Sequence, residues 1–512
     1  MLTVNKKIKS IFIVCALSLL VSIGCKEQIS SPEYQTLVPQ NNDTTGGSWK
    51  MYLAASPDDI ILPIPNATSS PEYTAELSAL KGYINTRTAE QLSTAKYWSS
   101  GAVLRWNEIA RALVAKYNVA PPYHADSAAK GNPYPVLNPP FANPPIASRV
   151  YAYLSVAQYD ALVASWSMKY KYNRPAPKLI DNTIENVISV PAIPSYPSEH
   201  AAIAAASCEV LAFFFPKEKE YLVELAMGHQ DSRLRIGANV QSDIVAGDSV
   251  GKYVSAKAIA RAKTDGTGAA GRADTVRYPI PMISTVWKSI ELQPDGAPLR
   301  PGMLPSWGKV KSWAVPNVDA ERPAPPPALE SKEFKDALAE VKTIADSRTR
   351  EQWRIADFWA DGGGTFTPPG HWNYIAAGLI RKNNMNELRA ARTLALMNIS
   401  IMDAGICCWD VKYVYYLPRP SQMDASIKTA TGVPNFPSYT SGHATFSGAA
   451  STVLGYVFQS EAGTLSAQAE EAALSRLLGG IHYRFDNEVG LRCGRNIGGW
   501  AVKLGQADGS PQ

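Results

Sequence analysis

Apolar side chains recur at helical spacing through most of the chain, whereas the alternation typical of strands is scarce. The pattern predicts long helices over residues 73–98, 101–117, 147–168, 199–215, 240–262, 331–345, 386–409, 442–458, 466–478 and 487–504. Most of the 38 prolines fall between them, chiefly in residues 121–145, 174–197 and 278–327. Because proline interrupts helices and stiffens connections, the sequence predicts an all-α fold with long ordered loops.

The chain contains an internal repeat. Residues 194–200 (PSYPSEH) correspond to residues 437–443 (PSYTSGH) at an offset of 243 residues. The same offset relates Arg233 to Arg476, Gly237 to Gly480, Asn239 to His482, and Asp243 to Asp486. Arg174-Pro175 corresponds to Arg419-Pro420 at an offset of 245 residues, which a loop insertion would explain. The repeat predicts two tandem related helical bundles.

The two copies differ in chemistry. Glu199 stands in place of Gly442, and an acidic side chain there would repel an oxyanion. Asn239 stands in place of His482, and an amide cannot act as a nucleophile or ligand as imidazole can. Lys412 corresponds to a position near Ser167, with lysines only nearby, at 169 and 171. We therefore expect the first bundle to be structural and only the C-terminal bundle to keep an intact site.

The second half carries a set of polar residues suited to one oxyanion. Three cations supply charge and two guanidinium forks, a serine and a glycine N–H add neutral donors, and two histidines supply ligand and proton chemistry: Lys412, Arg419, Ser441, Gly442, His443, Arg476 and His482. The helix expected to start beside His443 also favours anions at its N-terminus. The spacing therefore predicts a dry anion-binding active site.

His482 and Asp486 are four residues apart, so on a helix they share one face. The carboxylate would then fix the imidazole tautomer. One histidine can bind or attack the central atom while the other, His443, transfers protons on the opposite side. A lone Ser-Gly-His could be an ordinary helix N-cap, but seven specified residues at fixed spacings favour a catalytic site.

These residues resemble the superfamily that unites vanadium-dependent haloperoxidases with type 2 phosphatidic acid phosphatases and bacterial acid phosphatases. The resemblance implies that His482 coordinates vanadium or is the phosphorylated nucleophile, and that His443 is the acid–base residue. The oxyanion would be bound by Lys412, Arg419, Ser441, Gly442 and Arg476. The family fold is all-helical, and haloperoxidase members pair two four-helix bundles with one metal site.

Further segments look more like the haloperoxidase branch. Residues 358–362 (FWADG) and 367–373 (TPPGHWN) resemble the segment before the haloperoxidase site, in which an aspartate supports an active-site arginine. Asp361 is the candidate for that role. Phe436 stands where those enzymes place an aromatic residue or histidine near the halide. His371 is interpreted as a structural histidine in a proline-rich turn, and His124 and His229 as incidental.

The leading hypothesis is a vanadium-dependent haloperoxidase that uses vanadate, hydrogen peroxide, a halide and an organic acceptor. Phosphate would compete for the same site. The first alternative is an acid phosphomonoesterase that cleaves a phosphate ester through phosphohistidine. A third is a catalytically silent surface lipoprotein, against which the presence of both His443 and His482 argues.

The N-terminus predicts export. A basic start and an apolar stretch over residues 11–23 lead to Cys25, which resembles a bacterial lipoprotein lipidation site in the cell envelope. We expect a signal peptide over 1–25, a polar tether over 26–71, bundles over 72–265 and 329–512, and a proline-rich connection over 266–328.

Three of the five net positive charges lie in the signal, which argues against nucleic-acid binding. The lipid anchor would be the membrane contact. Cys407 and Cys408 are expected to be small buried side chains.

Overall fold

The computed structural model describes residues 35–118, 143–282, 285–290 and 302–511, and within these ranges every regular element is a helix. The predicted all-α class is confirmed. The predicted signal peptide, the lipidation residue Cys25 and His124 lie outside the described residues. Cys407 and Cys408 are buried, as predicted.

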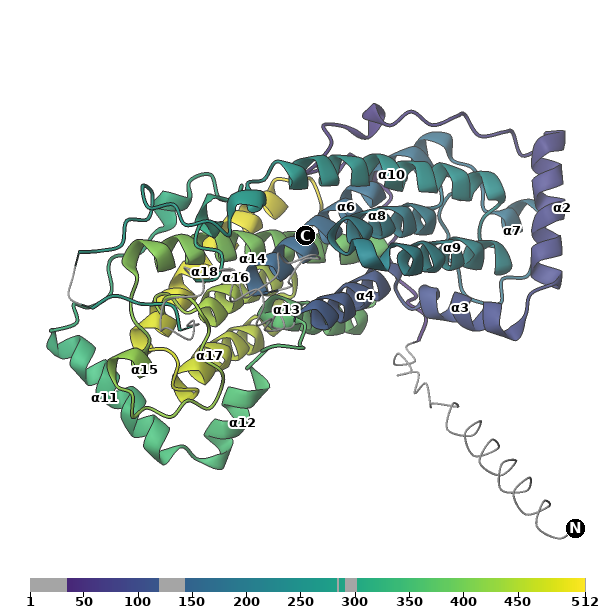
Figure 1. Cartoon of the computed structure of the whole chain (residues 1–512). Coiled ribbons are helices and arrows are strands. Elements are labelled where there is room, and N and C mark those ends of the chain that lie inside the picture. The colour runs from purple at the N-terminus through teal and green to yellow at the C-terminus, as the bar shows by residue number, and fades with distance from the viewer. Residues whose placement is uncertain (1–34, 119–142, 283–284, 291–301, 512) are drawn as a thin grey trace, which may run out of the picture. The chain divides into compact units, whose positions relative to one another are not determined.

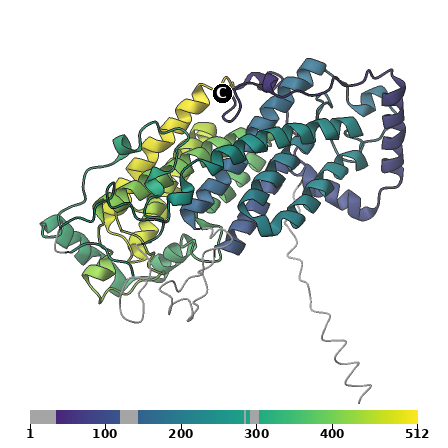
Figure 2. The ribbon, with the colours of Figure 1, turned by 45° about the horizontal axis from the view of Figure 1, so that its top comes forward.

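The helices form two bundles that are contiguous in sequence (Figures 1 and 2). The first contains α2 (Pro71–Asn85), α3 (Ala89–Ser99), α4 (Ala102–Tyr117), α6 (Pro144–Tyr172), α7 (Pro177–Ile180), α8 (Glu199–Phe214), α9 (Lys219–Arg235) and α10 (Gln241–Lys263). The second contains α11 (Lys332–Ser347), α12 (Arg350–Phe358), α13 (Thr367–Lys382), α14 (Glu387–Tyr415), α15 (Pro420–Met423), α16 (Gly442–Val457), α17 (Ala462–Leu478) and α18 (Arg484–Gln506).

The predicted duplication is present in the structure, and its offset is constant. From α6 to α10, each helix starts 243 residues before its counterpart from α14 to α18. Matching ion pairs lock the ends of the repeats, because Arg149 pairs with Asp265 at 2.6 Å and Arg392 pairs with Asp508 at 2.7 Å. Equivalent side-chain contacts, as well as the same order of helices, thus occur in both bundles.

The duplication extends further toward the N-terminus than the sequence motifs indicated, with an offset of 261 residues. Ser70 caps α2 and Ser331 caps α11 through the backbone N–H of the third helical residue. Thr88 and Thr349 begin α3 and α12 with reciprocal capping boxes. The cap at Thr88 also explains why the single helix predicted over residues 73–98 is broken into α2 and α3.

Part of the segment predicted as a polar tether instead packs on the N-terminal bundle. Trp49 and Met51 are buried in the core, and the N–H groups of residues 52, 53 and 54 donate to the buried carboxylate of Asp160. Residues 313, 314 and 315 donate in the same way to Asp403 in the second bundle. Periodicity does not reveal such a segment, because its backbone, rather than an apolar helix face, makes the polar contacts.

The structure also corrects two alignments between the halves. Lys169 is the counterpart of Lys412: their Nζ atoms donate to the carbonyls of residues 194 and 437, respectively. The N–H of Ser195 donates to the carbonyl of Arg174, and the N–H of Ser438 donates to that of Leu417. Arg174 therefore matches Leu417, so Arg419 matches Ala176, and the predicted loop insertion does not exist.

The bundles share one hydrophobic core, crossed by a buried polar chain. The amide of Asn107 on α4 donates to Asn373 on α13, whose amide donates to Asn398 on α14, which in turn donates to Ser155 on α6. Among the described helices, α14 is the one long and apolar enough to span a bilayer, and its apolar window is entirely buried inside the protein. Its apolar character is thus accounted for by its place in the core.

Candidate active site

The predicted site residues converge at one end of the C-terminal bundle. They come from the segment between α12 and α13, from α14, from the loops before α15 and α16, from the start of α16, from the end of α17, and from the loop before α18 and the start of α18. A cavity of about 620 Å³ opens here, lined by residues that include Phe436, Gly442, His443, Arg476 and His482. Residues more than 60 positions apart are thereby brought to one site.

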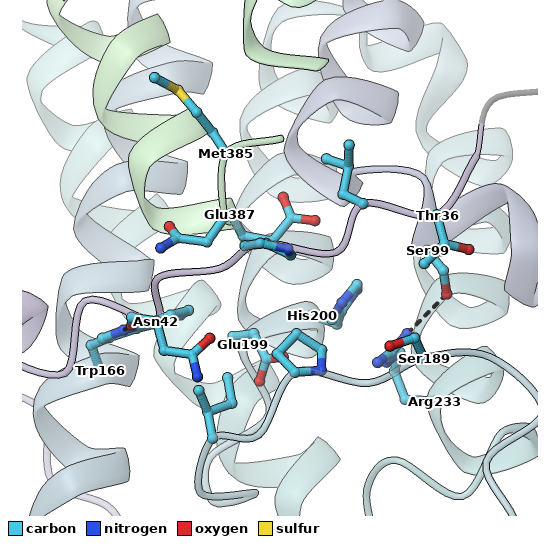
Figure 3. A pocket seen from close by; sticks show the side chains of 15 residues that line it. Thr36, Asn42, Ser99, Trp166, Ser189, Glu199, His200, Arg233, Met385 and Glu387 are labelled. Atoms are coloured by element: carbon cyan, nitrogen blue, oxygen red, sulfur yellow. Dashed lines mark hydrogen bonds between the residues drawn. The ribbon is translucent and has the colours of Figure 1, made fainter. Parts of the chain in front are cut away.

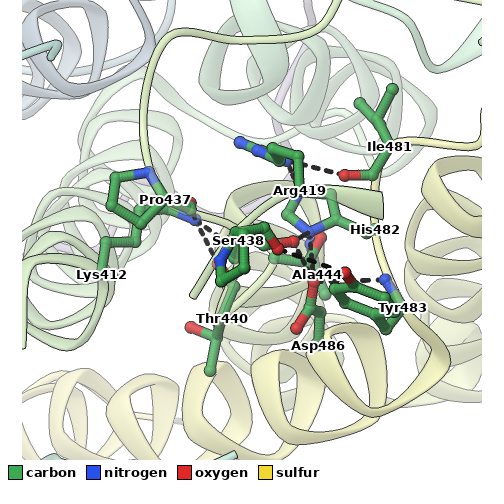
Figure 4. A network of polar contacts seen from close by, with 12 residues as sticks. Lys412, Arg419, Pro437, Ser438, Thr440, Ala444, Ile481, His482, Tyr483 and Asp486 are labelled. Carbon is green, nitrogen blue, oxygen red and sulfur yellow. Dashed lines mark hydrogen bonds and ion pairs between the residues drawn. The ribbon is translucent and has the colours of Figure 1, made fainter. Parts of the chain in front are cut away.

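His482 is held by hydrogen bonds on both ring nitrogens (Figure 4). Nη1 of Arg419 lies 2.9 Å from Nε2, and Oδ2 of Asp486 lies 2.8 Å from Nδ1. Because a guanidinium can only donate, Nε2 accepts and Nδ1 carries the proton that is donated to Asp486. The tautomer therefore directs the Nε2 lone pair toward Arg419, away from Asp486.

The predicted contact between His482 and Asp486 is confirmed, but its predicted cause is wrong. His482 precedes α18, and Asp486 is the third residue of that helix, where its carboxylate also accepts from the N–H of Tyr483 at 3.2 Å. The contact therefore depends on the capped helix start instead of a shared helix face. Ser438, given no role from the sequence, donates to the same carboxylate at 2.5 Å.

Burial controls the charge of this pair. It lowers the pKa of His482 well below its ordinary value, and Arg419 and Lys412 lower it further. Burial also raises the pKa of Asp486 to about 6, against opposing effects of Ser438 and Lys412. At neutral pH the imidazole is neutral, as a ligand or nucleophile must be.

Lys412 lies at the back of the site, completely buried. Its ammonium donates to the carbonyls of Pro437 and Ser438, each at 3.0 Å, and to that of Thr440 at 2.5 Å. Burial, together with the charge of Arg419, lowers the pKa of Lys412 to about 7. The lysine can therefore change charge near neutral pH.

Phe436 packs against two of the cations and also lines the cavity. Its ring centroid is 4.9 Å from Nζ of Lys412 and 4.9 Å from Cζ of Arg419, and the ring also packs on Trp409. Arg419 is fixed by bonds to the carbonyls of Phe436 and Ile481. Phe436 thus limits access of water to both cations, besides lining the cavity where the halide was expected.

Arg476 lines the cavity, and two hydrogen bonds to neighbouring segments fix its guanidinium. Nη1 donates to the carbonyl of Trp359 at 3.1 Å and Nη2 to the hydroxyl of Thr431 at 3.3 Å. Burial lowers the pKa of Arg476 to about 10, and the nearby carboxylate of Asp361 opposes this shift. The guanidinium remains charged at neutral pH.

Asp361 lies near the active-site Arg476 and is hydrogen-bonded to a histidine. Its carboxylate hydrogen-bonds to Nδ1 of His371 at 3.2 Å, and it acts on Arg476 through charge. His371 lies within α13 instead of a proline-rich turn, and its ring stacks on Trp359 at 4.4 Å between centroids. His371 thus helps position Trp359, whose backbone carbonyl accepts a hydrogen bond from Arg476.

The start of α16 presents Gly442 and His443 to the cavity. Ser441 is the N-cap, and its hydroxyl accepts from the N–H of Ala444 at 3.4 Å. As the first helical residue, Gly442 has an N–H outside the hydrogen bonds of the helix. Burial lowers the pKa of His443 well below its ordinary value, and Arg476 lowers it further. His443 is therefore a neutral base in the free site.

An oxyanion fits the unused donors of this site. Two buried donors, Nη2 of Arg419 and Nε of Arg476, have no hydrogen-bond partner among the described residues, and Nε2 of the neutral His443 is unpartnered too. Buried polar groups are rarely left unpaired, and anions satisfy several at once. Vanadate and phosphate both match this donor set, with the Nε2 of His482 as the ligand or nucleophile on the protein side.

Comparisons with known proteins agree with this geometry. The PAP2 superfamily model matches residues 150–263 and 393–509, one segment in each bundle. Vanadium chloroperoxidase from Curvularia inaequalis is 26% identical over 184 residues, which cover 28% of this chain and 30% of that protein. The chain therefore aligns with less than a third of that relative's length.

Solved structures resemble a larger part of the chain. A bacterial vanadium-dependent iodoperoxidase is 27% identical with a TM-score of 0.53, covering 70% of this chain and 91% of its own. A bacterial vanadium-dependent chloroperoxidase in its holo form is 17% identical with a TM-score of 0.53, covering 76% and 97%. The second likeness concerns the fold alone. The superfamily resemblance drawn from the sequence motifs is confirmed.

Proposed function

We propose that this chain belongs to the PAP2 superfamily, whose model matches one segment in each bundle, and that its C-terminal bundle holds the active site of a vanadium-dependent haloperoxidase. The observation that carries the proposal is the set of unpartnered buried donors around a neutral His482. The iodoperoxidase likeness, which covers both bundles, favours this branch over a phosphatase.

The residues present would hold vanadate through Nε2 of His482. Lys412, Arg419 and Arg476 would balance its charge, and the N–H of Gly442 would add a neutral donor. When bound, vanadate supplies the Lewis-acid centre that activates hydrogen peroxide for halide oxidation. An anion beside His482 would also accept from Arg419, whose Nη1 now occupies the Nε2 lone pair.

The chain's own groups then control protons and water. Asp486 and Ser438 keep the proton of His482 on Nδ1. The neutral His443 faces the cavity with a free Nε2 and is placed to accept or deliver a proton there. Phe436 shields the two rear cations from water, which strengthens their action on an anion.

A paired assay tests the proposal. Vanadate-loaded protein is given hydrogen peroxide with bromide or iodide, and vanadate-free protein is given a chromogenic phosphate ester. Vanadate-dependent halogenation is expected, and His482→Ala should abolish it. Ester hydrolysis that vanadate inhibits, without halogenation, would assign the chain to the phosphatases. Absence of both activities would support the silent lipoprotein.

We also propose that the protein acts in the bacterial cell envelope. The basic and apolar N-terminal segment ending at Cys25 supports this. Metabolic labelling with a radioactive fatty acid should mark the wild type and leave Cys25→Ser unlabelled. Equal labelling of both would contradict lipidation at this residue.

A further inference from the structure

A small cavity lies at the place in the N-terminal bundle that corresponds to the active site, and the start of α14 closes one side of it (Figure 3). Its volume is about 40 Å³, and Glu199, His200, Arg233 and Glu387 are among the residues that line it. The first three occupy the positions of Gly442, His443 and Arg476 in the other bundle. The cavity is therefore the counterpart of the oxyanion site.

The lysine of this counterpart binds a carboxylate from its own chain. Nζ of Lys169 lies 2.7 Å from Oε2 of Glu199, and both side chains are buried. The same ammonium donates to the carbonyl of Pro194 at 2.6 Å, as Lys412 does to Pro437. Glu199 thus supplies an anion at the position where the second bundle has a glycine without a side chain.

Arg233 faces the same anion. It is 2% exposed, Nη1 donates to Ser99 at 3.4 Å, and Nε has no hydrogen-bond partner among the described residues. Burial alone would raise the pKa of Glu199, but Lys169 and Arg233 outweigh it and lower that pKa. Glu199 is therefore an ionised carboxylate between two buried cations, with Glu387 as a second anion acting on Arg233.

Position 442 shows that a side chain can enter such a site. A Cβ atom built on Gly442 would lie 3.7 Å from Trp409 and 3.8 Å from Phe446, both ordinary contacts. The protein therefore leaves room at the start of α16 for a side chain. Glycine at 442 keeps open the space that Glu199 fills in α8.

A second histidine occupies Nδ1 of His200, the counterpart of His443. The indole of Trp106 can only donate, so Nδ1 of His229 accepts from it at 3.2 Å, and Nε2 of His229 donates to Nδ1 of His200 at 2.8 Å. Asn239, in place of His482, binds Ser198 and the carbonyl of Ser195. This half can hold an anion but has no histidine ligand at that position.

We propose that the N-terminal bundle contains a second oxyanion site that is closed by the carboxylate of Glu199, which acts as an internal substitute for the anion. Removing that carboxylate would open a site for a tetrahedral oxyanion such as inorganic phosphate, bound by Lys169, Arg233 and the helix start at Glu199. The comparison rests on the proposed oxyanion site of the C-terminal bundle.

Counting bound phosphate tests the inference on the full chain. Equilibrium dialysis with inorganic phosphate should give one anion per wild-type chain and two per Glu199→Gly or Glu199→Ala chain. Glu199→Gln should bind one, because the amide still fills the space. Adding Arg233→Gln to Glu199→Gly should remove the second anion.

The other possible phosphate stoichiometries either overturn or support the closed site. One anion per folded chain in both the Gly and Ala variants would overturn the inference, as would two in Glu199→Gln. If the Gly and Ala variants fail to fold, rescue by phosphate supports the closed site and lack of rescue overturns it. No anion in wild type but one in Glu199→Gly would refute the proposed C-terminal site and uphold this one.

Discussion

Nδ1 of His482 donates to Oδ2 of Asp486 at 2.8 Å, while Nε2 accepts from Arg419 at 2.9 Å. Replacing Asp486 with Asn should therefore disturb the tautomer that exposes the Nε2 lone pair. We expect vanadate affinity and halide oxidation to fall about 10- to 100-fold, as for other partners of a ligating histidine. Titration with vanadate followed by ⁵¹V NMR measures the affinity. Glu488→Gln, an exposed change on the same helix, should have no effect, and equal losses in both would contradict this role for Asp486.

Anion binding should weaken as pH rises through the pKa of Lys412. Burial lowers this pKa to about 7, and a bound anion favours the ammonium form. The affinity for the anion is thus highest below that pKa and falls by up to about tenfold per pH unit above it. Sulfate is a suitable probe because its own charge is constant in this range. Calorimetry from neutral pH upward, where Asp486 is already largely ionised, should show the fall in wild type and a flat profile in Lys412→Arg, where the charge does not titrate. A flat wild-type profile would contradict the proposed titration.

Phe436 should set the position of that pH profile. Its ring lies 4.9 Å from Nζ of Lys412 and contributes to the burial that lowers the lysine pKa. Phe436→Ala admits water, so the midpoint of sulfate binding should move to higher pH by about one unit or less. Phe458→Ala is a matched control, since that buried ring lies outside the lining of the active-site cavity. A midpoint that stays unchanged in Phe436→Ala would show that other groups shield the lysine.

The buried carboxylates of Asp160 and Asp403 should stabilise the fold. Each accepts three backbone N–H groups from a segment that lacks regular structure. Replacing Asp403 with Asn puts an amide NH₂ group against some of those donors, which should lower the free energy of unfolding by about 2 kcal/mol. Urea denaturation measures the change. Asp336→Asn, which removes an exposed ion pair with Lys332, should cost less than about 0.5 kcal/mol. A loss that small for Asp403→Asn would contradict the stabilising role.

The repeat made more of the fold predictable than the periodicity of each helix did. α9 was missed because Lys219–Arg235 has a weak apolar face, although its counterpart over residues 466–478 was predicted. Applying the 243-residue offset to that prediction would have found it. α13 was missed because Thr367–Pro369 opens it with residues that usually mark a turn, yet proline is well tolerated in a first helical turn.

Residue spacing by itself determined the all-α class, the duplication and the set of cations and histidines that form the C-terminal site, because these depend on residue types at fixed intervals. Only the tertiary structure decided which contacts those residues make. Asp486 reaches His482 from a capped helix start instead of a shared helix face, Ser438 donates to Asp486, Asp361 binds His371, and Lys169 pairs with Glu199. Such contacts depend on how distant segments pack and on which buried charges must be neutralised. The local periodicity of the sequence predicts neither.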